Sequence, residues 1–274
     1  MLESAAALKW YAEQGLDETI GEDAVDRFSL TQAVAAATAP VAMTPRAATP
    51  QPIRPGAPAP INRAPVPLES PQLVEDAREL ARRCNTLAEL EAAVRGFEGC
   101  ALKRTAKNTV FADGTSGAPV MIVGEAPGAD EDRLGKPFVG VSGQLMDRMM
   151  EAIGLTRAGG FYITNILFWR PPGNRQPTPQ EIQQCLPFVV RHIELVRPAV
   201  LVLLGGTSAK TILNQTEGIM RLRGRWFEYR SDESLPVIPA LPTYHPAYLL
   251  RSPGQKREAW RDFLALKLRM SDPL

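Results

Sequence analysis

Three apolar runs separated by stretches with helical spacing constrain the fold of this chain more than any other feature. Val120–Val123, Phe161–Thr164 and Val200–Leu204 have the length and composition of strands that are buried on both faces. Apolar residues recur at helical spacing over 142–153, and 179–196 has the pattern of a second helix. Because strands that alternate with helices form parallel sheets covered on both faces, we predict an α/β fold with three layers, α/β/α.

Composition divides the chain into three parts. Residues 1–33 carry seven acidic and two basic residues, and the spacing of their apolar residues is compatible with a short helix. From Val34 to Pro67 there are nine prolines and no acidic or aromatic residue, which predicts a Pro/Ala-rich disordered linker over 34–70. We expect one globular domain over 71–274. The N-terminal arm is expected either to bind a protein partner or to pack back on this domain.

Charge and cysteine content narrow the class of protein. Residues 205–270 contain eleven basic and six acidic residues, which suits a phosphate-bearing partner but also fits a solvated mixed-charge surface. Three cysteines without a signal-like N-terminus indicate a cytoplasmic protein. The sequence has no run of 18 or more apolar residues, so we expect no membrane span. We expect a monomer.

Polar side chains follow the predicted strands. Glu125 and Asn165 come one or two residues after the first two of these strands, and His245 comes four residues after a further, shorter predicted strand, Val237–Leu241. Taken singly, they fit a solvated glutamate, a turn asparagine and a turn histidine. Ligands of open α/β sheets bind at the carboxyl ends of the strands, and these three residues are expected to meet there. The pattern therefore predicts an active site that combines a carboxylate, an amide and an imidazole.

Several motifs occur in a fixed order: Gly-Glu-Ala-Pro-Gly at 124–128, Gly-Lys-Pro-Phe-Val-Gly at 135–140, Thr-Asn at 164–165, Arg-Pro-Pro-Gly-Asn-Arg at 170–175 and His-Pro-Ala-Tyr-Leu-Leu-Arg at 245–251. This set resembles the motifs of family 4 uracil-DNA glycosylases and covers about residues 97–267. The resemblance implies a central four-stranded parallel sheet between helices. It also implies a monofunctional enzyme that hydrolyses the N-glycosidic bond of uracil in DNA during base excision repair of deaminated cytosine.

The resemblance assigns roles to the residues of the motifs. His245 is expected to donate a hydrogen bond toward uracil O2, where negative charge develops. Glu125 is expected to orient or deprotonate the attacking water. Phe138 would stack on the base, and Asn165 would read its O4 and N3–H edge. The backbone of three further residues is expected to line the pocket: Ala126, Pro127 and Gly128.

Contacts to DNA are expected from two segments. Arg170 and Arg175 flank a Pro-Pro-Gly turn, which would press on the DNA backbone or stand in solvent as an ordinary turn. Leu249 and Leu250 are candidates for an apolar wedge that fills the gap left by the flipped base, with core leucines as the alternative. Arg251 is expected to contact a neighbouring phosphate.

The chain departs from the family at the cofactor. Family 4 members usually hold a four-iron–four-sulfur cluster on four cysteines, and the matching positions here are Phe97, Cys100, Trp169 and Cys185. Cys84, further upstream, would give three ligands at most. Phe97 and Trp169 are interpreted as apolar side chains that fill the vacated volume. We therefore predict that the protein has no intact cluster and no other cofactor.

Alternatives remain for both the substrate and one motif. The pocket could serve another deaminated base such as hypoxanthine, or the chain could be a DNA-binding module of the same fold without catalytic activity. The segment Gly205-Gly206-Thr207 resembles a phosphate-holding helix start. We expect it instead to be a tightly packed junction, with Thr207 capping a helix that begins there.

Overall fold

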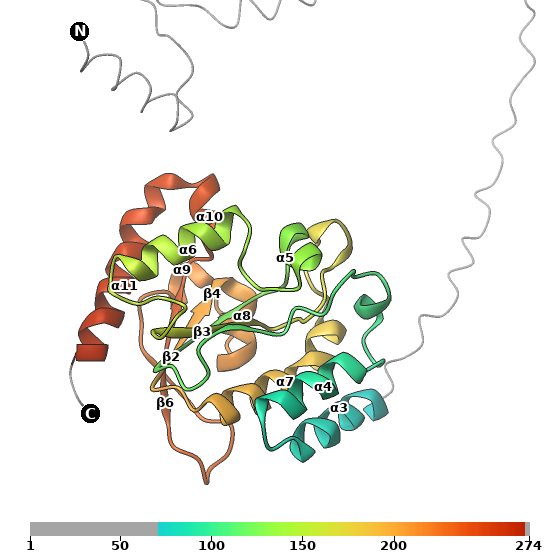
Figure 1. The fold of residues 1–274 in the computed structure, drawn as a ribbon. Helices are drawn as coiled ribbons and strands as arrows, with labels where there is room; N and C mark the ends of the chain where they lie inside the picture. Colours follow the sequence, from blue (N-terminus) through green and yellow to red (C-terminus); the bar gives the residue numbers. More distant parts are fainter. Residues whose placement is uncertain (1–70, 272–274) are drawn as a thin grey trace, which may run out of the picture. The chain divides into compact units, whose positions relative to one another are not determined.

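The computed structural model describes residues 71–271, and a six-stranded sheet lies at the centre of this part of the chain (Figure 1). The predictions for residues 1–33 and 34–70 fall outside the described residues. The helices are α3 (Pro71–Arg83), α4 (Leu87–Gly96), α5 (Ala129–Leu134), α6 (Val141–Glu151), α7 (Pro179–Val196), α8 (Gly205–Leu213), α9 (Ile219–Leu222), α10 (Pro246–Arg251) and α11 (Lys256–Ser271). The strands are β1 (Asp113–Gly114), β2 (Val120–Gly124), β3 (Phe161–Asn165), β4 (Val200–Leu204), β5 (Phe227–Tyr229) and β6 (Ile238–Thr243). Short 3₁₀ turns occupy Ala101–Arg104, Pro172–Asn174 and Pro253–Gln255.

The predicted four-stranded parallel sheet forms the middle of this larger sheet. The strand order is β1-β3-β2-β4-β6-β5, and β3, β2, β4 and β6 run parallel. The short strands β1 and β5 pair antiparallel at the two edges. In the register, Gly124 lies opposite Asn165 and Leu204 lies opposite Thr243. The four parallel strands therefore end in line, and the residues that follow them share one edge of the sheet.

Alternate residues of each buried strand face different helix layers, as the two-residue period of a strand requires. In β2, Met121 and Val123 belong to the core that contains the buried faces of α4 and α7. Val120 and Ile122 pack in the opposite core with buried residues of α6 and α11. Figure 1 shows the same division, with α3, α4 and α7 on one side of the sheet and α6, α10 and α11 on the other. The predicted α/β/α layering is confirmed.

Helix starts follow the capping chemistry of the sequence at two places. Thr86 accepts a hydrogen bond from the backbone of Glu89 at the start of α4, which completes a capping box. Thr178 and Glu181 form the same motif at the start of α7, with proline at the first helical position. Among the helices of the described residues, none is long and apolar enough to cross a membrane.

Helix α8 begins earlier than the sequence indicates. Its first residue is Gly205, which has φ +87°, and Leu204 occupies the N-cap position without a side-chain cap. The expectation that Thr207 caps this helix is wrong. The Thr207 hydroxyl instead donates to the carboxylate of Glu125.

Candidate active site

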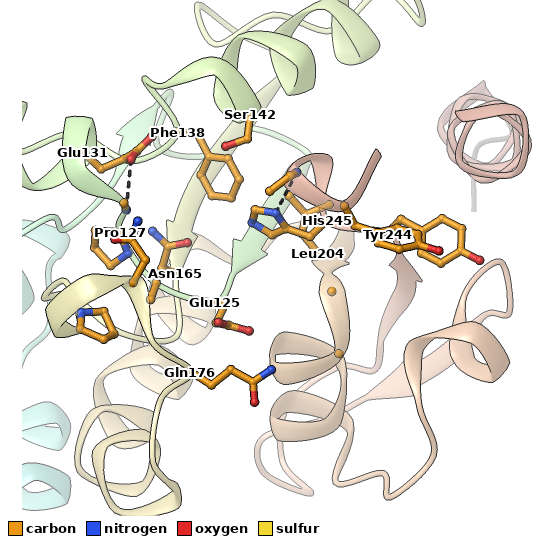
Figure 2. A pocket seen from close by; sticks show the side chains of 18 of the residues that line it. Glu125, Pro127, Glu131, Phe138, Ser142, Asn165, Gln176, Leu204, Tyr244 and His245 are labelled. Atoms are coloured by element: carbon orange, nitrogen blue, oxygen red, sulfur yellow. Dashed lines mark hydrogen bonds between the residues drawn. The ribbon is translucent and has the colours of Figure 1, made fainter. Parts of the chain in front are cut away.

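A pocket of about 540 Å³ opens at the edge of the sheet where the parallel strands end (Figure 2). The four residues expected to surround the base all line it: Glu125, Phe138, Asn165 and His245. Five further residues expected at the site also line it: Ala126, Pro127, Gly128, Arg175 and Arg251. We call this cavity the base pocket. It joins side chains that are up to 126 positions apart in the sequence, from Glu125 to Arg251.

Asn165 and Phe138 meet above Gly124. Asn165 ends β3, is 1% exposed, and its Oδ1 has no hydrogen-bond partner among the described residues. A Cβ atom on Gly124 would lie 2.4 Å from Asn165 Oδ1 and 2.5 Å from Phe138 Cζ. The amide and the ring therefore need a glycine at this position. A buried polar atom without a partner is costly in a folded protein, which makes this oxygen a candidate ligand-binding atom.

The backbone of Phe138 is held in an unusual conformation. Its φ is +54°, a region that residues with a side chain seldom occupy. The guanidinium of Arg157 donates to the carbonyl oxygens of Pro137 and Phe138. A Cβ atom on Gly143 would lie 2.0 Å from the Phe138 carbonyl oxygen, so the start of α6 also presses on this residue. These contacts keep the phenyl ring at the wall of the base pocket.

Glu131 joins the two loops that form this side of the base pocket. Its Oε2 accepts the N–H of Gly128 at 3.1 Å. Its Oε1 accepts the N–H groups of Val139 and Gly140, each at 2.9 Å. The glutamate is buried and lies three residues after the first sequence motif, but sequence reasoning assigned it no role. It links the Gly-Glu-Ala-Pro-Gly loop to the segment that carries Phe138.

His245 precedes α10 and is neutral at physiological pH. Burial, with a smaller contribution from the Arg251 charge, lowers the pKa of its imidazole to about 4. Nδ1 accepts the N–H of Ala247 at 3.2 Å, a contact drawn in Figure 2. This hydrogen bond assigns the remaining ring proton to Nε2. The ring centroids of His245 and Phe138 are 5.6 Å apart.

Glu125 is the first residue after β2, and both its backbone and its side chain are held. Its carbonyl oxygen accepts the N–H of Leu167 at 3.1 Å. Its Oε2 accepts the hydroxyl of Thr207 at 2.5 Å. Figure 2 shows the carboxylate inside the base pocket, below Asn165.

The arginines expected to contact DNA have different surroundings. Arg175 lines the base pocket, and its Nη1 donates to Glu181 Oε2 at 2.9 Å. Arg170 does not line it, and its Nε donates to Asn174 Oδ1 at 2.7 Å. Arg170 therefore supports the loop whose other end carries Arg175, whereas Arg251 faces the base pocket from α10.

One wedge candidate is a core residue. Leu249 is 0% exposed and packs with Leu145, Tyr244 and Ala259. In this position it cannot reach a DNA strand, so the structure assigns it to the alternative reading, a core leucine. Leu250, the next residue, is 39% exposed and stays a wedge candidate.

Sequence reasoning also missed part of the lining of the base pocket. The residues that line it without having been expected there include Ser142, Asn174, Gln176, Gly205, Gly206, Tyr244 and Tyr248. Tyr248 lies inside the last motif, and the two glycines follow the apolar run of β4, so their positions carried a signal. Gln176 follows the Arg-Pro-Pro loop and had no signal of its own. Figure 2 shows its amide pointing toward the start of α8.

The residues at the cluster positions do not fit a four-iron–four-sulfur group. Cys100 and Cys185 are buried side by side, and hydrogen bonding to Cys185 lowers the pKa of the Cys100 thiol. Phe97 packs edge-on against Phe188, with ring centroids 5.1 Å apart. Trp169 is buried, and its Nε1 donates to Thr109.

The third cysteine does not complete a ligand set. The thiol of Cys84 donates to the Leu80 carbonyl oxygen at 3.2 Å, at the end of α3. Within residues 71–271, no group of three or more Cys, His, Asp or Glu side chains could hold a metal ion. The two aromatic residues at the cluster positions pack with two neighbouring phenylalanines. We call these four buried residues the aromatic plug: Phe97, Phe168, Trp169 and Phe188.

Comparison with known proteins agrees with this geometry. The model of the uracil DNA glycosylase superfamily matches residues 111–265. The type-4 uracil-DNA glycosylase of Archaeoglobus fulgidus is 39% identical over 183 residues, which is 65% of this chain and 90% of that protein. The type-4 enzyme of Saccharolobus solfataricus is 38% identical over 65% of this chain and 83% of its own length. The type-4 enzyme of Thermotoga maritima is 34% identical over 58% of this chain and 80% of its own length.

The matched region contains the base pocket and all six strands of the described sheet. The chain belongs to the uracil DNA glycosylase superfamily.

Proposed function

We propose that the protein is a monofunctional DNA glycosylase that hydrolyses the N-glycosidic bond of uracil in DNA and so begins repair of deaminated cytosine. The observation that carries this proposal is the meeting of Phe138, Asn165, His245 and Glu125 in one pocket. Each of these side chains matches one requirement of the reaction. The relatives named as type-4 uracil-DNA glycosylases support the same activity.

The first requirement is selection of the base. The target nucleotide leaves the duplex at a cost of a few kcal/mol, which is smallest for a mismatched base. Stacking of the base on Phe138 would offset this cost with a favourable free energy of about 1–3 kcal/mol. Asn165 Oδ1, which has no partner within residues 71–271, would accept uracil N3–H while the amide nitrogen donates to O4. Cytosine presents the opposite pattern of donor and acceptor at these two atoms and would leave the asparagine unsatisfied.

The second requirement is stabilisation of the leaving group. When the bond between C1′ and N1 breaks, its electron pair passes to uracil and negative charge gathers on O2. Neutral His245 with its proton on Nε2 can donate to this oxygen without losing a proton itself. A preorganised donor of this kind lowers the barrier by roughly 3–4 kcal/mol.

The third requirement is a water molecule at C1′. The Glu125 carboxylate would accept a proton from this water as its oxygen bonds to the sugar carbon. Water supplies the new C1′–O bond, and uracil departs with the electrons of the old bond. In this mechanism no lysine amine forms a covalent intermediate, so the product is an abasic site in an intact strand.

We also propose how the protein contacts DNA and that it has no iron–sulfur cluster. Arg175 and Arg251 at the base pocket would contact phosphates, and Leu250 would fill the gap in the duplex. The protein would act as a cytoplasmic monomer without an iron–sulfur cluster, and its N-terminal arm would bind a protein partner. Stoichiometric iron and sulfide in the purified protein would contradict the proposal on the cluster.

A base-release assay tests the proposed activity. Single- and double-stranded oligonucleotides with one uracil are incubated with wild type, Asn165→Ala and His245→Ala, and abasic sites are then cleaved with alkali. We expect wild type to release uracil and each variant to be slower by about 100- to 1,000-fold. Asn85→Ala, which changes an exposed asparagine, is the matched control and should equal wild type. Strand breaks before alkali would contradict monofunctional hydrolysis.

A parallel substrate with hypoxanthine tests the specificity. Release of hypoxanthine at a higher rate than uracil would replace the proposed substrate by another deaminated base. Tight DNA binding with no base released from either substrate would favour a DNA-binding module instead.

A further inference from the structure

The hydroxyl of Thr207 forms a contact for which the reaction described above gives no reason. Thr207 Oγ1 donates to Glu125 Oε2 at 2.5 Å, although the two residues are 82 positions apart in the sequence. Glu125 lines the base pocket, whereas Thr207 lies in the first turn of α8 and does not line it. The threonine therefore contacts the carboxylate from outside the base pocket and does not occupy the space of the substrate.

Both partners of this hydrogen bond are attached to β2. Glu125 follows the last residue of β2 directly. The neighbour of Thr207 in α8, Ser208, is fully buried and donates to the carbonyl oxygen of Val123 in β2 at 2.7 Å. The helix that carries Thr207 is thus bonded to the strand that carries the carboxylate. Two connections to β2 therefore fix the hydroxyl relative to Glu125. One is the peptide bond from β2 to Glu125, and the other is the hydrogen bond from Ser208 to Val123.

Thr207 is also the sole hydrogen-bond donor to the Glu125 carboxylate among residues 71–271, and no ion pair in that range includes Glu125. A glutamate side chain has three rotatable bonds, and a hydrogen bond to one carboxylate oxygen restricts the directions in which the other oxygen can point. A threonine is suited to this task because its branched Cβ restricts χ1 within a helix.

We propose that Thr207 is a positioning residue for Glu125. Its hydroxyl holds Oε2, so that Oε1 faces the water that attacks C1′. During the step, the water oxygen bonds to C1′, the C1′–N1 bond breaks toward uracil, and the released proton passes to Oε1. The threonine keeps its own proton and touches neither substrate nor water. This inference rests on the proposed function, because it requires Glu125 to act on that water.

The experiment compares Thr207→Val, which removes the hydroxyl and keeps the shape, with Thr207→Ser, which keeps the hydroxyl. A hydrogen bond to a charged group predicts that Thr207→Val lowers kcat by about 10- to 100-fold. KM for the uracil oligonucleotide should stay unchanged, because the residue does not line the base pocket. Thr207→Ser should restore kcat to within about threefold of wild type. Thr211→Val, the same change one turn later in α8, is the matched control.

A second comparison separates positioning from a general loss of structure. In a Glu125→Ala background the carboxylate is absent, so adding Thr207→Val should change the rate no further. The midpoint of thermal unfolding is measured for every variant, and Thr207→Ala, which also removes the hydroxyl, serves as the test if Thr207→Val does not fold.

The possible outcomes distinguish the two proposals. If wild type releases uracil and Thr207→Val has the same kcat, the role of Thr207 is refuted and the proposed function stands. The same holds if Thr207→Val slows the Glu125→Ala variant by the factor seen in wild type. If wild type releases no uracil, the proposed function itself fails.

Discussion

Asn165 and Trp169 are four positions apart, yet they belong to regions of opposite character. Asn165 points a buried amide oxygen into the base pocket, and this oxygen has no hydrogen-bond partner within the part of the chain that the structure describes. Trp169 is buried in the aromatic plug, and its single polar atom is satisfied by Thr109. The first region keeps every residue that the resemblance to family 4 assigns to the base, while the second has exchanged two cluster positions for aromatic rings. Within four positions the chain therefore passes from a side chain that lines the base pocket to one that is part of the apolar core.

The two regions also differ in what they contribute to the stability of the folded protein. The base pocket retains features that lower stability, namely the bare oxygen of Asn165 and the positive φ of Phe138. The aromatic plug contains none of these among its described contacts and buries large apolar surfaces. We therefore expect substitutions in the base pocket to change activity and substitutions in the aromatic plug to change stability.

The largest effect should come from Trp169→Ala in the aromatic plug. Loss of a fully buried indole lowers the free energy of unfolding by about 3–5 kcal/mol. Denaturant unfolding measures this change, and base release at low temperature should remain near the wild-type rate for the folded fraction. Trp260→Ala is the control, since that tryptophan is 38% exposed on α11. A stable but inactive Trp169→Ala variant would break the comparison.

The next effect concerns the base pocket. In Gly124→Ala the new Cβ would overlap Asn165 Oδ1 and Phe138 Cζ, so the amide and the ring must move apart. A displacement on the order of 1 Å costs about 100-fold in rate. Gly159→Ala is a matched control, because a Cβ there meets no atom within 4 Å. The comparison would be sharpened if Gly124→Ala unfolds near the wild-type temperature, and weakened if its activity is unchanged.

A smaller effect is expected in the pH dependence of stability. Burial lowers the pKa of His192 to about 3, below its ordinary value near 6.5. The unfolded chain therefore binds this proton first, and the stability contributed by neutral His192 is complete above pH 6.5 and falls as the pH drops toward 3. The unfolding free energy of His192→Gln should decline less steeply over this interval than that of wild type. Identical slopes would remove His192 as a source of acid sensitivity.

The smallest effect is expected at the surface of the base pocket. Arg251→Ala removes a cation that faces it and should weaken binding to uracil-containing and undamaged DNA by a similar factor. The slope of log Kd against log salt should fall by about one unit. Arg257→Ala, an exposed arginine of α11, tests whether the effect is local. A change confined to uracil-containing DNA would place Arg251 on the base rather than on a phosphate.

Much of the fold was predictable because it depends on local patterns. The apolar runs of β2, β3 and β4 are typical of strands buried on both faces, and their alternation with helices implied the layers. The edge strand β1 has two residues and too little sequence to carry a pattern. The start of α8 was misjudged because glycines usually interrupt helices, while here Gly205 begins one.

The base pocket was predictable for side chains that follow strands and not for those that depend on tertiary packing. Glu125, Asn165 and His245 could be placed because parallel strands end at a common edge. The sequence left open which of Leu249 and Leu250 is a core residue, since α10 has six residues and too few turns to show a face. The hydrogen bond from Thr207 to Glu125 joins residues 82 positions apart, and the local sequence around neither residue predicts it.

The left-handed backbone of Phe138 has a consequence for how quickly a lesion can be examined. Arg157 and the start of α6 impose this conformation when the chain folds, at a cost of about 1–2 kcal/mol. Under the proposed function, an extruded nucleotide would meet a pocket wall that needs no loop rearrangement. Base capture should then be limited by opening of the double helix rather than by the loop that carries Phe138.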